Sequence, residues 1–159
     1  MQSVINKFPA VGIPGEFFSG RPRYVYAINA ATAVTLGGAA GKKADGTIGA
    51  MDAATYTTYC GVFVSPHQKV QANLVGANPT LTIPAGSEVG LAERGEVFIL
   101  VPSTETNGFA LGAKIYVTPA GVYTATASGN TLVGTCVGVS DPSTKVSAKG
   151  EVAAIRLGF

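Results

Sequence analysis

The sequence GEVFILV, residues 95–101, decides the fold class. Val97 and Ile99 alternate with Phe98 and Leu100, so an extended chain would present apolar side chains on both of its faces. β-branched and aromatic residues suit the pleated surface of a sheet. This segment therefore predicts a central strand that is buried on both faces.

Short strand-like segments flank this strand and are separated by turn residues. They span residues 22–28, 32–36, 59–65, 69–75, 80–83, 88–92, 114–118, 122–125, 131–139 and 151–157. Residues 37–49 are rich in glycine and polar side chains and predict an exposed loop, and residues 51–56 are the one window that suits a single helical turn. The pattern predicts an all-β fold, a small β-barrel or sandwich with an extended N-terminal arm and little helix.

The first twenty residues differ from the rest of the chain. Pro9 and Pro14 interrupt any regular helix, yet Phe8, Phe17 and Phe18 are too apolar for a solvated tail. We therefore expect residues 1–20 to form an extended N-terminal arm and residues 21–159 to form one β-rich domain. The arm could pack along its own domain, or it could lie across a neighbouring subunit, which is the arrangement that we expect.

The composition favours life in an assembly. Apolar residues make up 47% of the 159 residues but charged residues only 13%, with a formal net charge of +2. A surface with so few charges offers little repulsion between copies or partners. The 11 basic residues are scattered rather than gathered in a stripe, which argues against nucleic-acid binding. No apolar stretch is long enough for a membrane-spanning helix, and the N-terminus lacks a secretion-signal pattern.

The chain offers few side chains that could perform chemistry. His67 is the one histidine, and its place between two strand-like segments predicts a loop position. No Gly-x-Ser-x-Gly nucleophile elbow occurs. The glycine-rich stretch at 36–43 departs from a phosphate-binding loop at both ends, where Leu36 and Lys43 stand in place of Gly and Ser or Thr. We expect no catalytic residues, no cofactor and no metal site.

The remaining candidates have structural interpretations. Glu88, Glu93 and Glu96 form the one local acidic cluster, and their neighbours predict a hairpin with solvated charges rather than paired catalytic carboxylates. Tryptophan is absent, so a carbohydrate-binding module lacks support. Cys60 and Cys136 lie in apolar strand-like segments and predict two buried thiols, with a disulfide open only if their strands are neighbours.

The order of several segments is informative. Phe8-Pro9-Ala10-Val11-Gly12-Ile13-Pro14-Gly15-Glu16-Phe17 is followed by Arg21-Pro22-Arg23, and later by residues 82–86, 95–98, 112–117, 134–138 and 151–157. Over nearly its whole length the chain resembles the structural cement, or head decoration, proteins of tailed bacteriophages. The resemblance implies a β-rich protein that binds the major capsid protein, stabilises the expanded shell and is usually a homo-oligomer, here a dimer or a trimer. It brings no catalytic or cofactor residues.

This resemblance places the expected protein in the virion, on the outer surface of the capsid, after synthesis in the host cytoplasm. We expect it to bridge the seams between capsid subunits through the arm. The expected partner-binding residues are Phe8, Ile13, Phe17, Phe18, Arg21 and Arg23. The phenylalanines would be apolar anchors, and the arginines would bind capsid carboxylates. The alternatives are another virion subunit, from a tail or baseplate, and the less supported carbohydrate-binding module.

Overall fold

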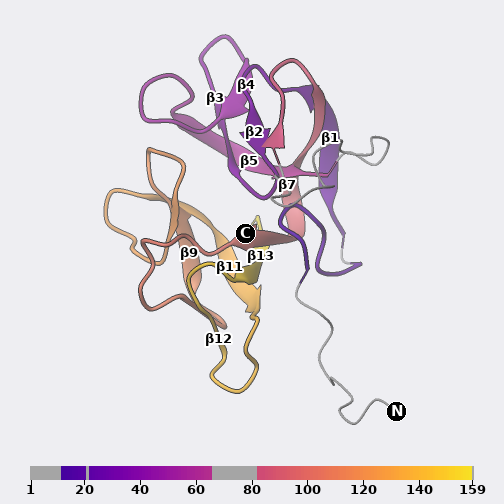
Figure 1. Cartoon of the computed structure of the whole chain (residues 1–159). Coiled ribbons are helices and arrows are strands. Elements are labelled where there is room, and N and C mark those ends of the chain that lie inside the picture. The colour runs from indigo at the N-terminus through magenta and orange to yellow at the C-terminus, as the bar shows by residue number, and fades with distance from the viewer. Residues whose placement is uncertain (1–11, 21, 66–81, 159) are drawn as a thin grey trace.

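The computed structural model describes residues 12–20, 22–65 and 82–158, and within these ranges it contains strands and no helix (Figure 1). The strands are β1 (Tyr24–Asn29), β2 (Val34–Thr35), β3 (Ala39–Lys42), β4 (Ile48–Ala50), β5 (Thr58–Val64), β6 (Thr82–Ile83), β7 (Glu88–Leu100), β8 (Phe109–Ala110), β9 (Lys114–Val117), β10 (Tyr123–Thr124), β11 (Thr131–Gly138), β12 (Val146–Ser147) and β13 (Val152–Leu157). The expected all-β fold is confirmed.

β7 organises the main sheet. The sheet is antiparallel and curled, in the order β10-β9-β11-β13-β7-β5-β3-β4, with β1 also paired to β7. The first half of β7, residues 88–94, pairs with β1 and β5, and the second half, residues 95–100, pairs with β13. Figure 1 shows β1 to β5 in one group and β9, β11, β12 and β13 in another, with β7 between them. The segment GEVFILV therefore occupies the predicted central position.

Two apolar clusters cover opposite faces of β7. One contains Val89 and Leu91 with residues of β2, β3, β5 and β6. The other contains Ala92, Val97 and Ile99 with residues of β9, β11 and β13. The prediction of burial on both faces is wrong at one position, because Leu100 is 50% exposed while Val97 and Ile99 are fully buried.

The predicted loop at 37–49 is also wrong, because β3 and β4 form a paired hairpin there. Ala39, Ala40 and Gly41 are buried in β3, and the chain segment at Tyr56 approaches Gly41 closely. A methyl group on Gly41 would lie 2.0 Å from the Tyr56 carbonyl oxygen. The small residues thus reflect close packing of backbone in a sheet, not an exposed connection.

Residues 51–56 do not form the expected helical turn. The Asp52 carboxylate accepts hydrogen bonds from the backbone N–H groups of Ala54, Thr55 and Tyr56, which close an irregular bend. These donors, Thr55 first, lower the pKa of Asp52. Asp commonly stabilises a turn in this way, at the expense of a helix.

The expected hairpin around Glu88, Glu93 and Glu96 is wrong as well, since all three lie in one continuous strand. Gly95, at φ 127°, lets β7 change direction between its halves without ending. Glu96 is only 4% exposed and is not a solvated charge.

The two cysteines are free. Cys60 lies in β5 and Cys136 in β11, and β7 and β13 stand between these strands in the sheet. Because the strands are not neighbours, the condition for a disulfide is not met. The expected strand at 69–75 lies outside the described residues.

Candidate binding surface

Residues 12–20 lie along the second half of β7 in the same chain. The Gly15 N–H donates to the Phe98 carbonyl over 2.8 Å, the Phe98 N–H donates to Glu16 over 2.9 Å, and the Phe18 N–H donates to Glu96 over 2.7 Å. Phe17 forms an antiparallel bridge with Val97. Of the two arrangements considered for the arm, packing along its own domain therefore describes this part of it.

Phe17 and Arg23 stabilise the domain together. Phe17 packs against the cluster that contains Val97 and Ile99. The Arg23 guanidinium carbon lies 4.5 Å from the centroid of the Phe17 ring. A cation–π contact of this kind contributes about 0.5–1 kcal/mol at an exposed site. The predicted anchor and the predicted cation thus contact each other within the chain.

Phe18 points to the opposite face. Its ring meets the Phe98 ring edge-on, with the centroids 5.4 Å apart and the planes at 85°. Its far edge lies over the backbone of β11, where a methyl group on Gly138 would be 3.1 Å from the ring. Phe18 remains 41% exposed, so this packing covers one side of the ring and leaves the other side open.

An apolar strip continues from Phe18 across the outer face of β7 and β13. We define it as Phe18, Phe98, Leu100 and Val152. Leu100 lies opposite Val152 in the antiparallel register, and both therefore project from the same face of the sheet. Leu100 is 50% exposed and Phe18 is 41% exposed. Exposed apolar residues that gather on one face mark sites of protein or membrane contact.

A partly buried ion pair borders the strip. The Nε and Nη2 atoms of Arg156 each lie 2.9 Å from Oε1 of Glu96. Arg156 is opposite Glu96 in the register of β13 and β7. The pair places a compensated carboxylate beneath the surface, because a buried charge is tolerated only when it is neutralised and hydrogen-bonded.

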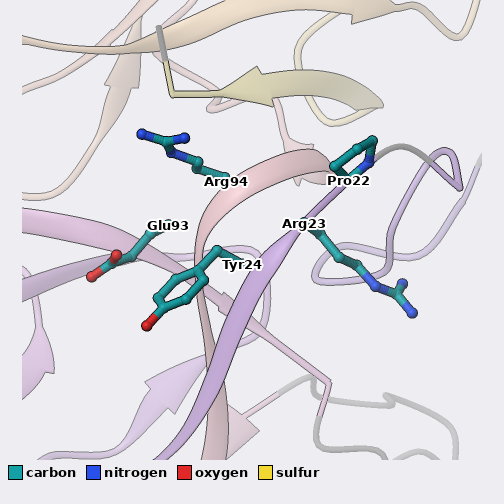
Figure 2. Close-up of a pocket in the computed structure, with 5 residues that line it drawn as sticks. All are labelled: Pro22, Arg23, Tyr24, Glu93 and Arg94. Atoms are coloured by element: carbon teal, nitrogen blue, oxygen red, sulfur yellow. The ribbon is translucent and has the colours of Figure 1, made fainter.

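A hollow of about 470 Å³ lies where β1 meets the middle of β7, and its walls are shown in Figure 2. The lining residues are Pro22, Arg23, Tyr24, Glu93 and Arg94. The picture shows the Arg23 side chain extending away from those of Glu93 and Arg94. A smaller hollow of about 300 Å³ shares Pro22 and Arg94 and reaches Arg156.

Tyr26 fixes one carboxylate of this hollow. Its hydroxyl donates to Glu93 over 2.9 Å. Burial, followed by this hydrogen bond and the charge of Glu93, raises the pKa of Tyr26 to about 12. The phenol is therefore a hydrogen-bond donor rather than an acid near neutral pH.

A family model described as "Structural cement protein (E217 gp24/Pam3 gp6)" matches residues 1–158. The chain belongs to this phage structural cement family. Its role is therefore that of a cement protein that decorates a capsid. None of the curated proteins compared with the chain matches it.

The cement chain also resembles a solved structure described as "The capsid of Myoviridae Phage XM1". The TM-score is 0.66, and the match covers 97% of this chain and 94% of the other. At 15% sequence identity, this likeness shows a shared fold.

The structure describes four of the six residues predicted to bind a partner in this cement chain. Phe18 belongs to the exposed strip and Ile13 is 47% exposed in the arm, whereas Phe17 and Arg23 pack against each other. Phe8 and Arg21 lie outside the described residues.

Other parts of the surface were missed from the sequence. Leu100 belongs to a strand whose pattern suggested burial on both faces, and no sequence signal marked it as exposed. Tyr24 and Arg94 are brought together only by the pairing of β1 with β7. The sequence offered one indication that these two residues lie in a binding surface, which is that Tyr and Arg are frequent in interfaces.

The described part of the cement chain contains no group of three or more His, Cys, Asp or Glu residues placed to hold a metal ion. The described ranges contain no helix, and therefore no helix that could cross a membrane. Burial raises the pKa of the Cys60 thiol to about 11, which disfavours the reactive thiolate. His67 lies outside the described residues.

Proposed function

We propose that this cement chain binds the outer surface of a phage head across the seams between major capsid protein subunits, and that it stabilises the shell without a catalytic step. The observation that carries the proposal is the apolar strip. Phe98, Leu100 and Val152 belong to the outer face of the central strands β7 and β13, Phe18 of the arm packs against Phe98, and Leu100 is half exposed. Covering them with a partner would bury apolar area worth about 25 cal/mol per Å².

The arm supplies the second part of the contact. Residues 12–20 bring the chain to the edge of the strip, and residues 1–11 add Val4, Ile5, Phe8 and Val11. A stable contact between proteins buries about 1,600 Å² in total, which exceeds what a few strip residues provide. We therefore assign the arm and the strip to one continuous contact with the shell.

Self-association belongs to the same proposal. A dimer or a trimer would present several arms and strips to neighbouring capsid subunits, and linked contacts bind more tightly than single ones. Breaking a seam would then require several contacts to open together, which is how a cement protein would strengthen the shell.

The direct test adds purified chain to heads that lack it. We expect saturable binding, density on the outside of the seams in electron micrographs, and greater resistance of the heads to heat. Density confined to the tail or baseplate, or no binding to heads, would contradict the proposal.

A truncation tests the arm separately. Removing residues 1–20 would also remove the backbone hydrogen bonds that join Gly15, Glu16 and Phe18 to β7. A loss of stability could then not be told apart from a loss of binding. A chain that begins at residue 12 keeps these bonds. We expect it to retain the thermal stability of the full chain and to bind heads more weakly. Equal affinity would show that residues 1–11 do not take part in the contact.

A further inference from the structure

The bulge in β7 turns two charged side chains onto one exposed face. Tyr24 pairs with Arg94 but Val25 pairs with Ala92, so Glu93 is an extra residue opposite β1. Glu93 and Arg94 are both exposed. In a regular strand neighbouring residues point to opposite faces, and bulges are known to redirect side chains in this way.

The Arg94 side chain is supported along its stem. A methyl group on Gly158 would lie 3.1 Å from Cγ of Arg94, so the backbone at the end of β13 passes close to the side chain. The two hollows of about 470 Å³ and 300 Å³ both include Arg94 among their lining residues. A long side chain that rests against backbone loses less conformational freedom when it binds a partner.

The neighbouring charges already have partners. Glu93 accepts a hydrogen bond from Tyr26, and Arg156 pairs with Glu96. Within the described ranges, no carboxylate forms an ion pair with Arg94. Arg94 therefore presents a guanidinium to solvent beside the Tyr24 ring, which is 58% exposed.

We propose that this notch binds a carboxylate of an acidic side chain on the capsid shell, with Arg94 as the cation and Tyr24 as the adjoining wall. This inference rests on the proposed function. Arginine binds carboxylates through two parallel hydrogen bonds, and arginine and tyrosine are both frequent at the centres of protein interfaces. The phenol hydroxyl of Tyr24 offers one further donor.

The shell is a better source of this carboxylate than a second copy of the chain. Six of the nine acidic residues accept hydrogen bonds or form ion pairs within their own chain, namely Asp45, Asp52, Glu93, Glu96, Asp141 and Glu151. A second copy would have to share one of these carboxylates between two contacts. Glu16, Glu88 and Glu105 are what a second copy could offer without such sharing.

The experiment compares head binding by the full chain and by Arg94→Ala, Arg94→Lys and Lys114→Ala. Lys114 is an exposed cation on β9, so Lys114→Ala is the matched control that removes one positive charge elsewhere. We expect roughly tenfold weaker binding for Arg94→Ala, the scale of one strong interface contact. Arg94→Lys should lie between it and the full chain, because an ammonium cannot form the paired hydrogen bonds. Lys114→Ala should bind as the full chain does.

The controls separate the possible failures. Thermal unfolding should differ little among the four proteins, since Arg94 and Lys114 are both exposed. Equal affinity of Arg94→Ala and the full chain would overturn this inference and leave the proposed function standing. If Arg94→Ala changed the oligomeric mass of the free protein but not its affinity for heads, the inference would be overturned. The carboxylate that Arg94 binds would then belong to a second copy of the chain. Failure of the full chain to bind heads would overturn the proposed function and this inference with it.

Discussion

The two halves of β7 both contribute apolar residues to the core but lie in different surroundings. Residues 88–94 have β1 on one edge and β5 on the other, and Leu91 is fully buried. Residues 95–100 have β13 on one edge and the arm segment on the other, and Leu100 is half exposed. The apolar side chains of the first half are all buried within the chain, whereas those of the second half are buried only in part.

This difference shows where apolar sequence exceeds what the fold needs. The first half uses all of its apolar side chains in the core. The second half uses Val97 and Ile99 in the core, covers Phe98 with Phe18, and leaves Leu100 open. Unburied apolar side chains that gather on one face are better explained by a partner than by stability, whereas a single exposed leucine is ordinary.

Stability measurements on two leucines test the comparison most strongly. Leu91→Ala should lower the free energy of unfolding by about 3 kcal/mol, because it opens a cavity in a packed core. Leu100→Ala should lower it by about 0.5 kcal/mol, as is usual for surface positions. Denaturant unfolding of both variants gives the two values. Similar losses for both would mean that the halves are equally buried.

The ion pair at the start of the second half should have an intermediate effect. Arg156→Met removes the cation beside the buried Glu96 carboxylate, and we expect a loss of about 1–2 kcal/mol, reduced from the value for fully buried pairs because Arg156 is partly exposed. Arg156→Lys keeps the charge and should lose less. Unfolding in denaturant measures both variants, and a neutral effect of Arg156→Met would show that the pair contributes only specificity.

Phe18 should contribute less. Phe18→Ala removes one edge-to-face contact and a ring that is 41% exposed, and we expect a loss of about 1 kcal/mol. The melting temperature would report this change. A loss as large as that of Leu91→Ala would assign Phe18 to the core rather than to the strip.

The smallest effect concerns alkaline pH in the first half. Burial and Glu93 raise the pKa of Tyr26 from 10.0 to about 12, so the folded state holds this proton more tightly than the unfolded state. The stabilisation is complete below pH 10 and is lost as the pH rises toward 12. Titration by phenolate absorbance should show a lower pKa for Tyr26 in Glu93→Gln, yet one above 10, because burial is the larger cause. An unchanged value would exclude the Glu93 contact.

Much of the sheet could be predicted from the sequence, because alternation and turn residues are local signals. The central place of GEVFILV and most strands outside 37–49 and 66–81 follow the predicted segments. The β3 and β4 hairpin was missed because buried backbone contacts and flexible loops both favour glycine and alanine. Alternation identifies which residues share a face, but it does not reveal whether that face is covered.

The binding surface was harder to predict for the same reason. Phe17 and Phe18 are neighbours of equal hydrophobicity, and only the bridge between Phe17 and Val97 determines which ring enters the core. The position of Arg94 depends on a bulge, which appears in the register of β1 and β7 and not in either sequence alone. Pairing between distant segments therefore supplied the information that the sequence lacked.

The central claim is that the apolar strip is a contact with the capsid shell. The most direct measurement compares the affinity of Leu100→Ser and Leu111→Ser for heads that lack the protein, since these leucines are 50% and 48% exposed. The account predicts at least about tenfold weaker binding for Leu100→Ser and no change for Leu111→Ser, with similar unfolding for both. Undiminished binding by Leu100→Ser would contradict it.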